Sequence, residues 1–285
     1  MPSYNHGHFL KRALDSLIVQ TYNNWQLIIV DNHSTDNTNE VVSSFNDPRI
    51  TYLKTNNNGV IAASRNIGIE ASKGQWIAFL DSDDYWTKDK LEVCSNYFED
   101  DIDLVHHDLK IVPKKLKFLF KKLFSRQAKT PALIDLLLNG NFIANSSVVV
   151  RKKLLLQIGG ISENKEMIAA EDYNAWLRIS ELTEGFHYIQ ETLGFYEMHI
   201  NAVSAVKDMS VPTRIALSEF EGAINESLKI KIEANLRFIK GKFNYHNKNY
   251  LTARKEFLFC AKSGLIKVKI KSILLLLAIE MKNHF

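Results

Sequence analysis

The stretch Trp76-Ile77-Ala78-Phe79-Leu80-Asp81-Ser82-Asp83-Asp84 decides how this chain is interpreted. Its five apolar residues predict a buried strand, and three aspartates follow within four positions. Carboxylates clustered beside a buried strand cost free energy unless a positive group neutralises them. Ligands bind at the carboxyl ends of strands in open α/β sheets, and carboxylates hold Mg²⁺ or Mn²⁺ there together with substrate phosphates. The stretch therefore predicts a metal-diphosphate site, with the structural alternative that Asp83 and Asp84 begin the next helix.

Strands and helices alternate on both sides of this stretch. Apolar runs predict strands at residues 25–30, 50–53, 102–105 and 147–150, and helical spacing predicts helices at 9–18, 60–71 and 171–179. From about residue 211 onward the pattern is helical and rich in aromatic residues. We therefore expect an α/β fold with a mostly parallel sheet flanked by helices, followed by a C-terminal helical extension.

The expected domain boundaries follow these patterns. The α/β domain should span residues 1–205 and the helical C-terminal region residues 206–285. Within the α/β domain, we expect two halves, at about residues 1–108 and 130–205, separated by a basic insert at 109–129.

Composition narrows the class of protein. A hydrophobic content of 46% over 285 residues is ample for a packed core. The two cysteines, Cys94 and Cys260, have no metal-type spacing, which favours a reduced, cytoplasmic protein. The longest uninterrupted apolar run, residues 273–279, is far too short for a bilayer span.

The net charge of +4 conceals an uneven distribution. Residues 110–129 carry eight Lys/Arg and no acid, and residues 229–285 carry thirteen Lys/Arg and three acids. The rest of the chain, which contains the aspartate motif, is therefore acidic. An acidic body favours a cation-dependent site and argues against nucleic-acid binding.

Two basic segments have the pattern of membrane-surface helices. In residues 113–129, an apolar stripe would form if the segment is helical, and lysines flank it. In residues 267–277, apolar residues are interleaved with Lys267, Lys269 and Lys271. Both patterns predict docking on an anionic membrane surface, at the inner face of the cell membrane. For 113–129, the alternative is a solvated loop that covers the active site.

A set of motifs occurs in a fixed order along the chain. They are Pro2-Ser3-Tyr4-Asn5, Gln20-Thr21-Tyr22 with Val30 to Asp36, Asn58-Gly59 with Ala63 to Gly68, Leu80 to Asp84, Ser146-Ser147-Val148 with Gly159-Gly160, Ala170 to Tyr173, and Tyr196 with His199 and Asn201. This ordered set resembles the family 2 glycosyltransferases of the GT-A fold that build bacterial cell-surface polysaccharides such as O-antigen. The resemblance covers roughly residues 1–205 and extends no further than the motifs it rests on.

The resemblance implies an inverting sugar transfer from a nucleotide-diphosphate donor, expected to be a UDP-sugar, to a glycan or lipid-linked acceptor. It implies the following roles: Ser3, Tyr4, Asp31, Arg65 and Asp81 bind the nucleotide; Asp83, Asp81 and His199 hold Mn²⁺ or Mg²⁺; and Asp172, as general base, with Glu171 beside it, is catalytic.

Each implied role has a purely structural alternative. Tyr4 could simply pack, Asp31 could cap local backbone, Arg65 could belong to a charged helix face, and residues 171–172 could populate a helix amino terminus, where acids are favoured. A metal-independent transferase is a further alternative. A degenerate, non-catalytic domain that binds a glycan or a partner is the alternative function.

The chain also departs from the family pattern. An apolar first strand precedes the Pro2–Asn5 motif in the family, and here that strand is expected to be missing, which would leave backbone groups of its neighbours unpaired. The hypothesis is that Met1 is an internal methionine of a longer protein. Asn32 and His33 stand where the family commonly has Asp and Gly, so the nucleotide preference is open.

Overall fold

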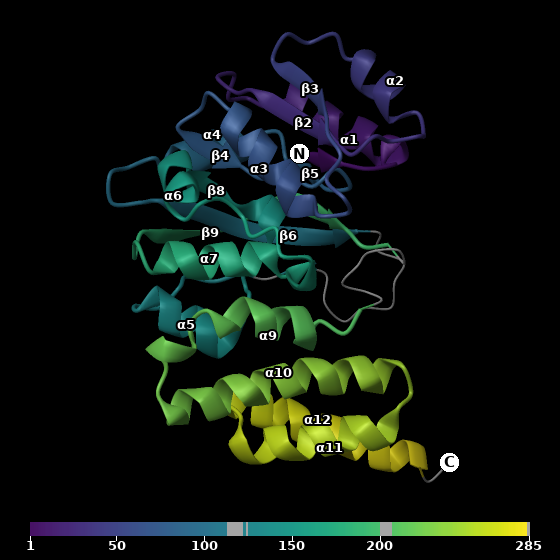
Figure 1. The fold of residues 1–285 in the computed structure, drawn as a ribbon, viewed down its shortest axis with the longest axis vertical. Helices are drawn as coiled ribbons and strands as arrows, with labels where there is room; N and C mark the ends of the chain where they lie inside the picture. Colours follow the sequence, from purple (N-terminus) through teal and green to yellow (C-terminus); the bar gives the residue numbers. More distant parts are fainter. Residues whose placement is uncertain (113–121, 124, 200–206, 284–285) are drawn as a thin grey trace.

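The computed structural model describes residues 1–112, 122–123, 125–199 and 207–283. Two sheets and their helices form the upper part of the molecule, and a layer of long C-terminal helices lies below them (Figure 1).

The first sheet is entirely parallel, in the order β1-β2-β3. Its strands are β1 (Pro2–Ser3), β2 (Leu27–Asp31) and β3 (Ile50–Lys54), and its helices are α1 (Gly7–Ile18), α2 (Thr38–Ser43) and α3 (Ile61–Ala71). The apolar face of α1 packs on buried β2, with Leu10 and Leu14 in one cluster with Ile29. This part agrees with the predicted α/β pattern.

The second sheet is mixed, in the order β4-β8-β6-β9-β5, with β7 paired to β6. Its strands are β4 (Trp76–Ala78), β5 (Tyr85–Trp86), β6 (Leu104–Val112), β7 (Lys122–Leu123), β8 (Val149–Arg151) and β9 (Phe186–Glu197). Among the described strands of this sheet, β6 and β9 pair in parallel, and the other four pairs are antiparallel. The expected mostly parallel arrangement thus describes the first sheet, whereas the second sheet combines both directions.

Shorter helices surround the second sheet and build the main core. They are α4 (Lys90–Ser95), α5 (Ala132–Asn139), α6 (Lys152–Gln157) and α7 (Glu171–Ser180), with single turns η1 (Asn145–Ser147) and η2 (Lys165–Met167). Trp176 of α7 is fully buried, and its ring lies edge-on to Phe79, with the ring centroids 5.8 Å apart. Burial of such large aromatic rings fixes α7 against the end of β4.

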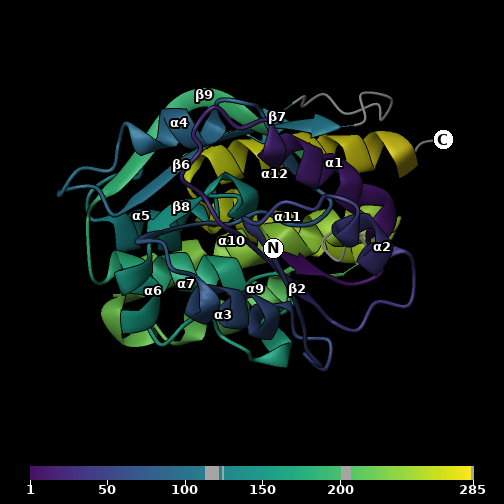
Figure 2. The ribbon, with the colours of Figure 1, turned by 90° about the horizontal axis from the view of Figure 1, so that it is seen from above.

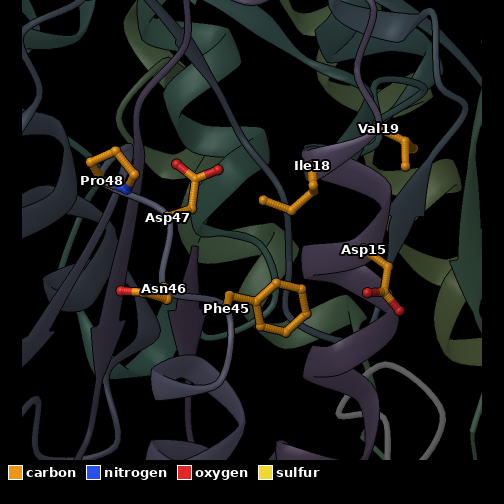
Figure 3. A pocket seen from close by; sticks show the side chains of 7 residues that line it. All are labelled: Asp15, Ile18, Val19, Phe45, Asn46, Asp47 and Pro48. Carbon is orange, nitrogen blue, oxygen red and sulfur yellow. The ribbon is translucent and has the colours of Figure 1, made fainter.

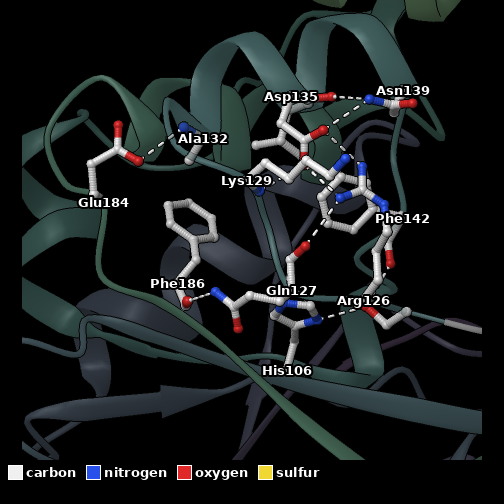
Figure 4. Close-up of polar contacts among 12 residues, drawn as sticks. His106, Arg126, Gln127, Lys129, Ala132, Asp135, Asn139, Phe142, Glu184 and Phe186 are labelled. Carbon is white, nitrogen blue, oxygen red and sulfur yellow. Dashed lines mark hydrogen bonds and ion pairs between the residues drawn. The ribbon is translucent and has the colours of Figure 1, made fainter.

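The predicted basic insert is partly built into the sheet. Residues 109–112 continue β6, and Lys122–Leu123 pairs back on β6 as β7, so these two residues are not helical as the amphipathic pattern assumed. The rest of that stripe, residues 113–121 and 124, lies outside the described residues. Beyond it, Asp135 receives two bonds from Arg126 and one from the Lys129 N–H, which ties the returning chain to α5 (Figure 4).

A cavity lies beside the short strand β1, between the two sheets. β1 is only two residues long, and its residues pair with Val30 and Asp31. Beyond it, the Met1 α-ammonium donates to the Ile28 carbonyl at 2.9 Å, and burial lowers the pKa of that ammonium to about 5. A cavity of about 950 Å³ separates β2 from β4, lined by both strands. In the described part of the chain, the two sheets are therefore not joined by backbone pairing.

The C-terminal region is helical, as expected. It contains α9 (Ser210–Ser218), η3 (Glu221–Ala223), α10 (Glu226–His246), α11 (Tyr250–Ser263) and α12 (Ile266–Asn283). Viewed from above, α10–α12 extend beneath the sheets (Figure 2). Ala253, Phe257 and Ile279 form a separate buried cluster that holds α11 and α12 together. No described helix combines the length and the apolar content that a bilayer crossing demands.

Candidate active site

Arg65 joins the two acidic stretches that the sequence singled out. Its Nη1 donates to Glu171 Oε1 at 2.6 Å, and its Nη2 donates to Asp81 Oδ1 at 2.8 Å. Burial alone would lower the pKa of Arg65, but the two carboxylates outweigh it and raise that pKa. Glu171 is the first residue of α7, and Asp81 follows β4, so a side chain from α3 holds both elements at one place.

Asp81 also makes hydrogen bonds with two neutral side chains. Asn145 Nδ2 donates to the same Oδ1 atom at 3.0 Å, and the Asp81 N–H donates to Ser146 Oγ at 3.1 Å. Burial opposes ionisation of Asp81, yet the Arg65 charge and the bonds from Arg65 and Asn145 lower its pKa. Asp81 is therefore ionised, and its Oδ1 atom already accepts hydrogen bonds from Arg65 and Asn145.

Asp172 has the electrostatic character of a general base. Its Oδ1 accepts the Tyr173 N–H at 2.7 Å, and its Oδ2 accepts from Asn141 Nδ2 at 3.3 Å. Burial and the neighbouring Glu171 carboxylate raise the pKa of Asp172 to about 7. A carboxylate with a pKa near neutrality can both accept a proton and release it again near neutral pH.

Glu171, which the resemblance predicts to be catalytic, is held by contacts within the protein. Besides Arg65, it accepts the Ala169 N–H through Oε2 at 2.6 Å, and its side chain is buried. Both of its oxygens are therefore engaged within the protein. This geometry makes Glu171 a residue that positions Arg65 and raises the pKa of Asp172.

Two of the three predicted metal ligands, Asp83 and His199, lie next to each other. Asp83 Oδ2 lies 3.0 Å from His199 Nε2, whereas Asp81 is turned toward Arg65. Among the described residues, no three His, Cys, Asp or Glu side chains meet in a group that could hold a metal ion. Two protein ligands suit Mg²⁺ or Mn²⁺ only where substrate phosphates and water complete the coordination. The donor set at Asp83 and His199 fits that case. Asn201, the third residue of this motif, lies outside the described residues.

The loop that carries Asp83 is fixed to β9. Asp84 is buried and accepts the Glu197 N–H at 2.9 Å. Burial, Asp83 and Asp81 raise the pKa of Asp84 well above its usual range. Arg12 of α1 donates to the Asp83 carbonyl at 3.1 Å and to Glu197 Oε2 at 2.7 Å. These contacts hold the loop in place and leave the Asp83 carboxylate to its histidine partner.

The predicted nucleotide-base residues lie together at the carboxyl ends of β1 and β2. Ser3 pairs with Asp31 in the parallel register, and Tyr4 follows with an exposed ring. Asp31 is fully buried and accepts bonds from the N–H and the hydroxyl of Ser34. Asp31 therefore makes the local capping contacts that were the structural alternative for it. The base-binding role stays a prediction.

A hollow on the far side of α1 stands apart from these residues. It has a volume of about 380 Å³ and lies between the end of α1 and the segment after α2 (Figure 3). Its lining residues are Asp15, Ile18, Val19, Phe45, Asn46, Asp47 and Pro48. It contains none of the predicted site residues.

Several residues around the acids were missed from the sequence. Asn145, Asn141 and Arg12 hold Asp81, Asp172 and the Asp83 loop, but the sequence reasoning assigned them no role. His6 was also missed, although its Nδ1 lies 2.8 Å from Ser82 Oγ beside His199. The available signal was their position next to quoted motifs, because Asn145 directly precedes Ser146 and His6 follows Asn5.

Comparison with known proteins defines the class. The model of the family described as Glycosyl transferase family 2 matches residues 1–159, and this chain belongs to that family. Two similar relatives are Escherichia coli proteins named UDP-Glc:alpha-D-GlcNAc-diphosphoundecaprenol beta-1,3-glucosyltransferase. WfaP is 30% identical over 72% of this chain and 78% of its own length. WfgD is 38% identical over 39% of this chain, and the match spans less than half (45%) of its own length.

Solved structures of TarS from S. aureus share the fold. The complex of TarS with UDP-GlcNAc aligns with a TM-score of 0.66 and 18% identity, covering 94% of this chain and 81% of that chain. The UDP complex aligns with a TM-score of 0.60 and 16% identity, covering 99% of this chain and 89% of that chain. These likenesses confirm the predicted GT-A fold with its C-terminal helices.

Proposed function

We propose that this protein is an inverting glycosyltransferase that moves a sugar from a UDP-sugar to a glycan or lipid-linked acceptor. One observation carries the proposal: Arg65 brings Asp81 and Glu171 together, so that Asp172, whose pKa is raised to about 7, lies in the same network as the aspartate motif. Sugar transfer requires both a base for the acceptor and a site for the departing diphosphate, and this network supplies both.

In the proposed reaction, Asp172 takes the proton of an acceptor hydroxyl as that oxygen attacks the anomeric carbon. The new glycosidic bond forms on the face opposite the bond to the diphosphate, which breaks and releases UDP with the bonding electron pair. The proton remains on Asp172 until solvent removes it. Because Asp172 titrates near neutrality, neither step requires a strongly unfavourable proton transfer.

Asp83 and His199 are the residues that would hold Mn²⁺ or Mg²⁺ in this reaction. When bound, the cation supplies positive charge to the diphosphate oxygens as negative charge develops on them. His199 must be neutral to serve as a ligand, and Asp83 must be ionised. Ser3, Tyr4 and Asp31 are the proposed contacts of the nucleotide base, and their shared position at two strand ends supports that role.

The acceptor and the place of reaction are part of the proposal. The names of the two E. coli relatives place their acceptor sugar on diphosphoundecaprenol, which is a lipid-linked diphosphate. We therefore propose a lipid-linked acceptor for this chain, met by a cytoplasmic protein at the inner face of the cell membrane.

A panel of nucleotide sugars tests the reaction. Purified protein is incubated with each donor, a short-chain GlcNAc-diphosphate lipid and Mn²⁺, and acceptor-dependent release of nucleoside diphosphate is measured. We expect one UDP-sugar to stand out from the GDP- and CDP-sugars. Donor binding without turnover for every member of the panel would instead support the degenerate, non-catalytic domain.

Metal dependence is tested on the same reaction. Asp83→Asn should raise the Mn²⁺ concentration needed for half-maximal rate by at least about tenfold, because an amide is a weaker ligand for a hard cation than a carboxylate. Asp89→Asn, an aspartate at the start of α4 outside the network, is the matched control. Full activity of wild-type protein in excess EDTA would contradict the metal assignment.

A further inference from the structure

Helix α12 carries a row of aliphatic side chains that face solvent. They are each between 48% and 74% exposed, and they are Ile266, Ile270, Ile273, Leu274, Leu277 and Met281. Their spacing of three and four residues places them on one face of the helix, here called the α12 stripe. Removing these apolar surfaces from water would be favourable. A contiguous exposed apolar row of this length is typical of a binding surface.

The opposite face of α12 is buried against the neighbouring helix α11. Ser272 and Ile279 are fully buried, and Ile279 packs with Ala253 and Phe257 of α11. Leu275 and Leu276 lie against the same cluster. The α12 stripe is therefore not the part of the helix that holds the fold together. The stripe is exposed on the face of α12 away from that cluster, and α12 lies at the end of the molecule opposite the first sheet (Figure 1).

Lysines flank the α12 stripe. At about 100° per residue, Lys267 and Lys271 border one side of it and Lys269 the other. Within the described residues, no carboxylate is within ion-pair distance of these three ammonium groups, although other cations of α9 and α10 do have acidic partners. Burial, and to a lesser extent the nearby Lys271 charge, lower the pKa of Lys242.

The charge pattern distinguishes between two possible binding partners of the α12 stripe, a second copy of this chain and a lipid surface. A second copy of this chain would bring an equally basic surface to the contact, since residues 229–285 hold thirteen Lys/Arg and only three acids. Like charges at one interface oppose association. An anionic lipid surface offers both an acyl boundary for the apolar row and negative head groups for the lysines.

We propose that the α12 stripe and its flanking lysines dock this protein on an anionic phospholipid surface, with α12 lying in the plane of the head groups. The stripe enters the acyl boundary, and the lysines remain at the level of the phosphates. This docking surface deepens the proposed function, on which it rests only for the choice of a membrane as the place of reaction. Binding to lipid needs neither donor nor acceptor, so it can be measured separately from transfer.

Vesicle sedimentation of the full chain tests the proposal. One set of vesicles is phosphatidylcholine alone, and the other contains about one third phosphatidylglycerol. We expect wild-type protein to bind the anionic vesicles at least about tenfold more tightly. At about 1 kcal/mol per lysine near such a surface, Lys267→Gln with Lys271→Gln should weaken binding roughly thirtyfold. Ile270→Gln with Leu277→Gln should weaken it on both vesicle types.

Matched controls separate the stripe from general charge and exposure. Leu251→Gln removes an exposed apolar side chain from α11, and Lys165→Gln removes a lysine from η2, and neither should change binding. Equal binding to both vesicle types, or double variants that bind like wild type, would overturn the proposal. So would a wild-type dimer in light scattering that Ile270→Gln with Leu277→Gln converts to a monomer without any change in vesicle binding. Retained transfer to a water-soluble acceptor by a variant that no longer binds vesicles would leave the proposed function intact.

Discussion

At the scale of single residues, the buried guanidinium of Arg65 organises the site. Removing one partner of a buried ion pair is strongly destabilising because the other charge is left without compensation, at a cost of roughly 3–5 kcal/mol. Arg65→Met leaves both Glu171 and Asp81 in that condition, so we expect a loss of that size in urea unfolding. Arg254→Met, on the exposed side of α11, should change the free energy of unfolding by less than about 0.5 kcal/mol. Equal effects of the two changes would show that Arg65 does not carry this network.

Asp172 gives a pH-dependent stability of predictable sign. Its folded pKa of about 7 lies above the ordinary 3.8, so folded protein holds a proton between these values that unfolded protein releases. Ionisation of Asp172 therefore costs stability increasingly as the pH rises from 4 to 7, and the cost is complete above 7. Asp172→Asn should match wild type near pH 4 and exceed it by up to about 4 kcal/mol at pH 8, since one pKa unit corresponds to about 1.4 kcal/mol.

Thermal unfolding of both proteins across this pH range measures the difference. The same titration predicts that kcat/KM of wild type falls below about pH 7 as Asp172 takes up its proton. A stability difference that does not vary with pH would mean that Asp172 keeps an ordinary pKa in the fold.

At the scale of elements, the position of α3 depends on a tight turn. Asn66, next to Arg65, accepts the Ile161 N–H at 2.8 Å and donates to the Ile161 carbonyl at 2.8 Å. Gly160 in this turn has φ +83°, and a Cβ there would lie 2.8 Å from Asn66 Oδ1. Gly160→Ala should therefore push α3 away from α7, cost about 1–3 kcal/mol and lower kcat without a substrate contact being removed.

Gly222→Ala is the matched control for that change, because a Cβ at Gly222 meets nothing within 4 Å. Differential scanning calorimetry and the donor assay on both variants give the comparison. If the Gly160 variant kept wild-type stability and kcat, the turn would have no part in placing Arg65.

Elements with a strong apolar period were predictable from the sequence. β2, α3 and α7 lie within a few residues of the expected ranges, since burial on one face dictates their pattern. The sequence predicts a strand only at residues 102–105 and a basic insert from 109, whereas β6 extends to Val112, with buried Leu109 and Ile111 on either side of Lys110 as in a half-buried strand. For β6, the alternation of apolar and polar residues predicts the extent of the strand better than the charge composition does.

The polar network at the site could be predicted only in part. The resemblance singled out Asp81, Asp83 and Asp172, although acids at a helix start, such as Asp172, also have a local explanation. The Arg65 contacts span 16 and 106 positions of sequence, and the Asn145 contact spans 64. Such pairings are decided by how the sheets and helices pack, which the spacing of residues along one element does not encode.

At the scale of the whole molecule, three regions of the chain carry different parts of the proposed function. The first sheet presents the candidate nucleotide contacts, and the second sheet with α7 presents the acids. The basic helices α10–α12 lie at the opposite end and offer the candidate membrane surface (Figure 1). This separation places an acidic site and a basic docking face on one chain, as the uneven charge of the sequence indicated.

The most direct test of the sugar-transfer account is a single-turnover assay on Asp172→Asn at saturating UDP-sugar and acceptor, with Glu166→Gln, an exposed acid of η2, as control. Loss of a general base should slow transfer by roughly 10²–10⁴-fold, while UDP affinity stays within a factor of about three and the control transfers at the wild-type rate. Transfer by Asp172→Asn at the wild-type rate would contradict the account.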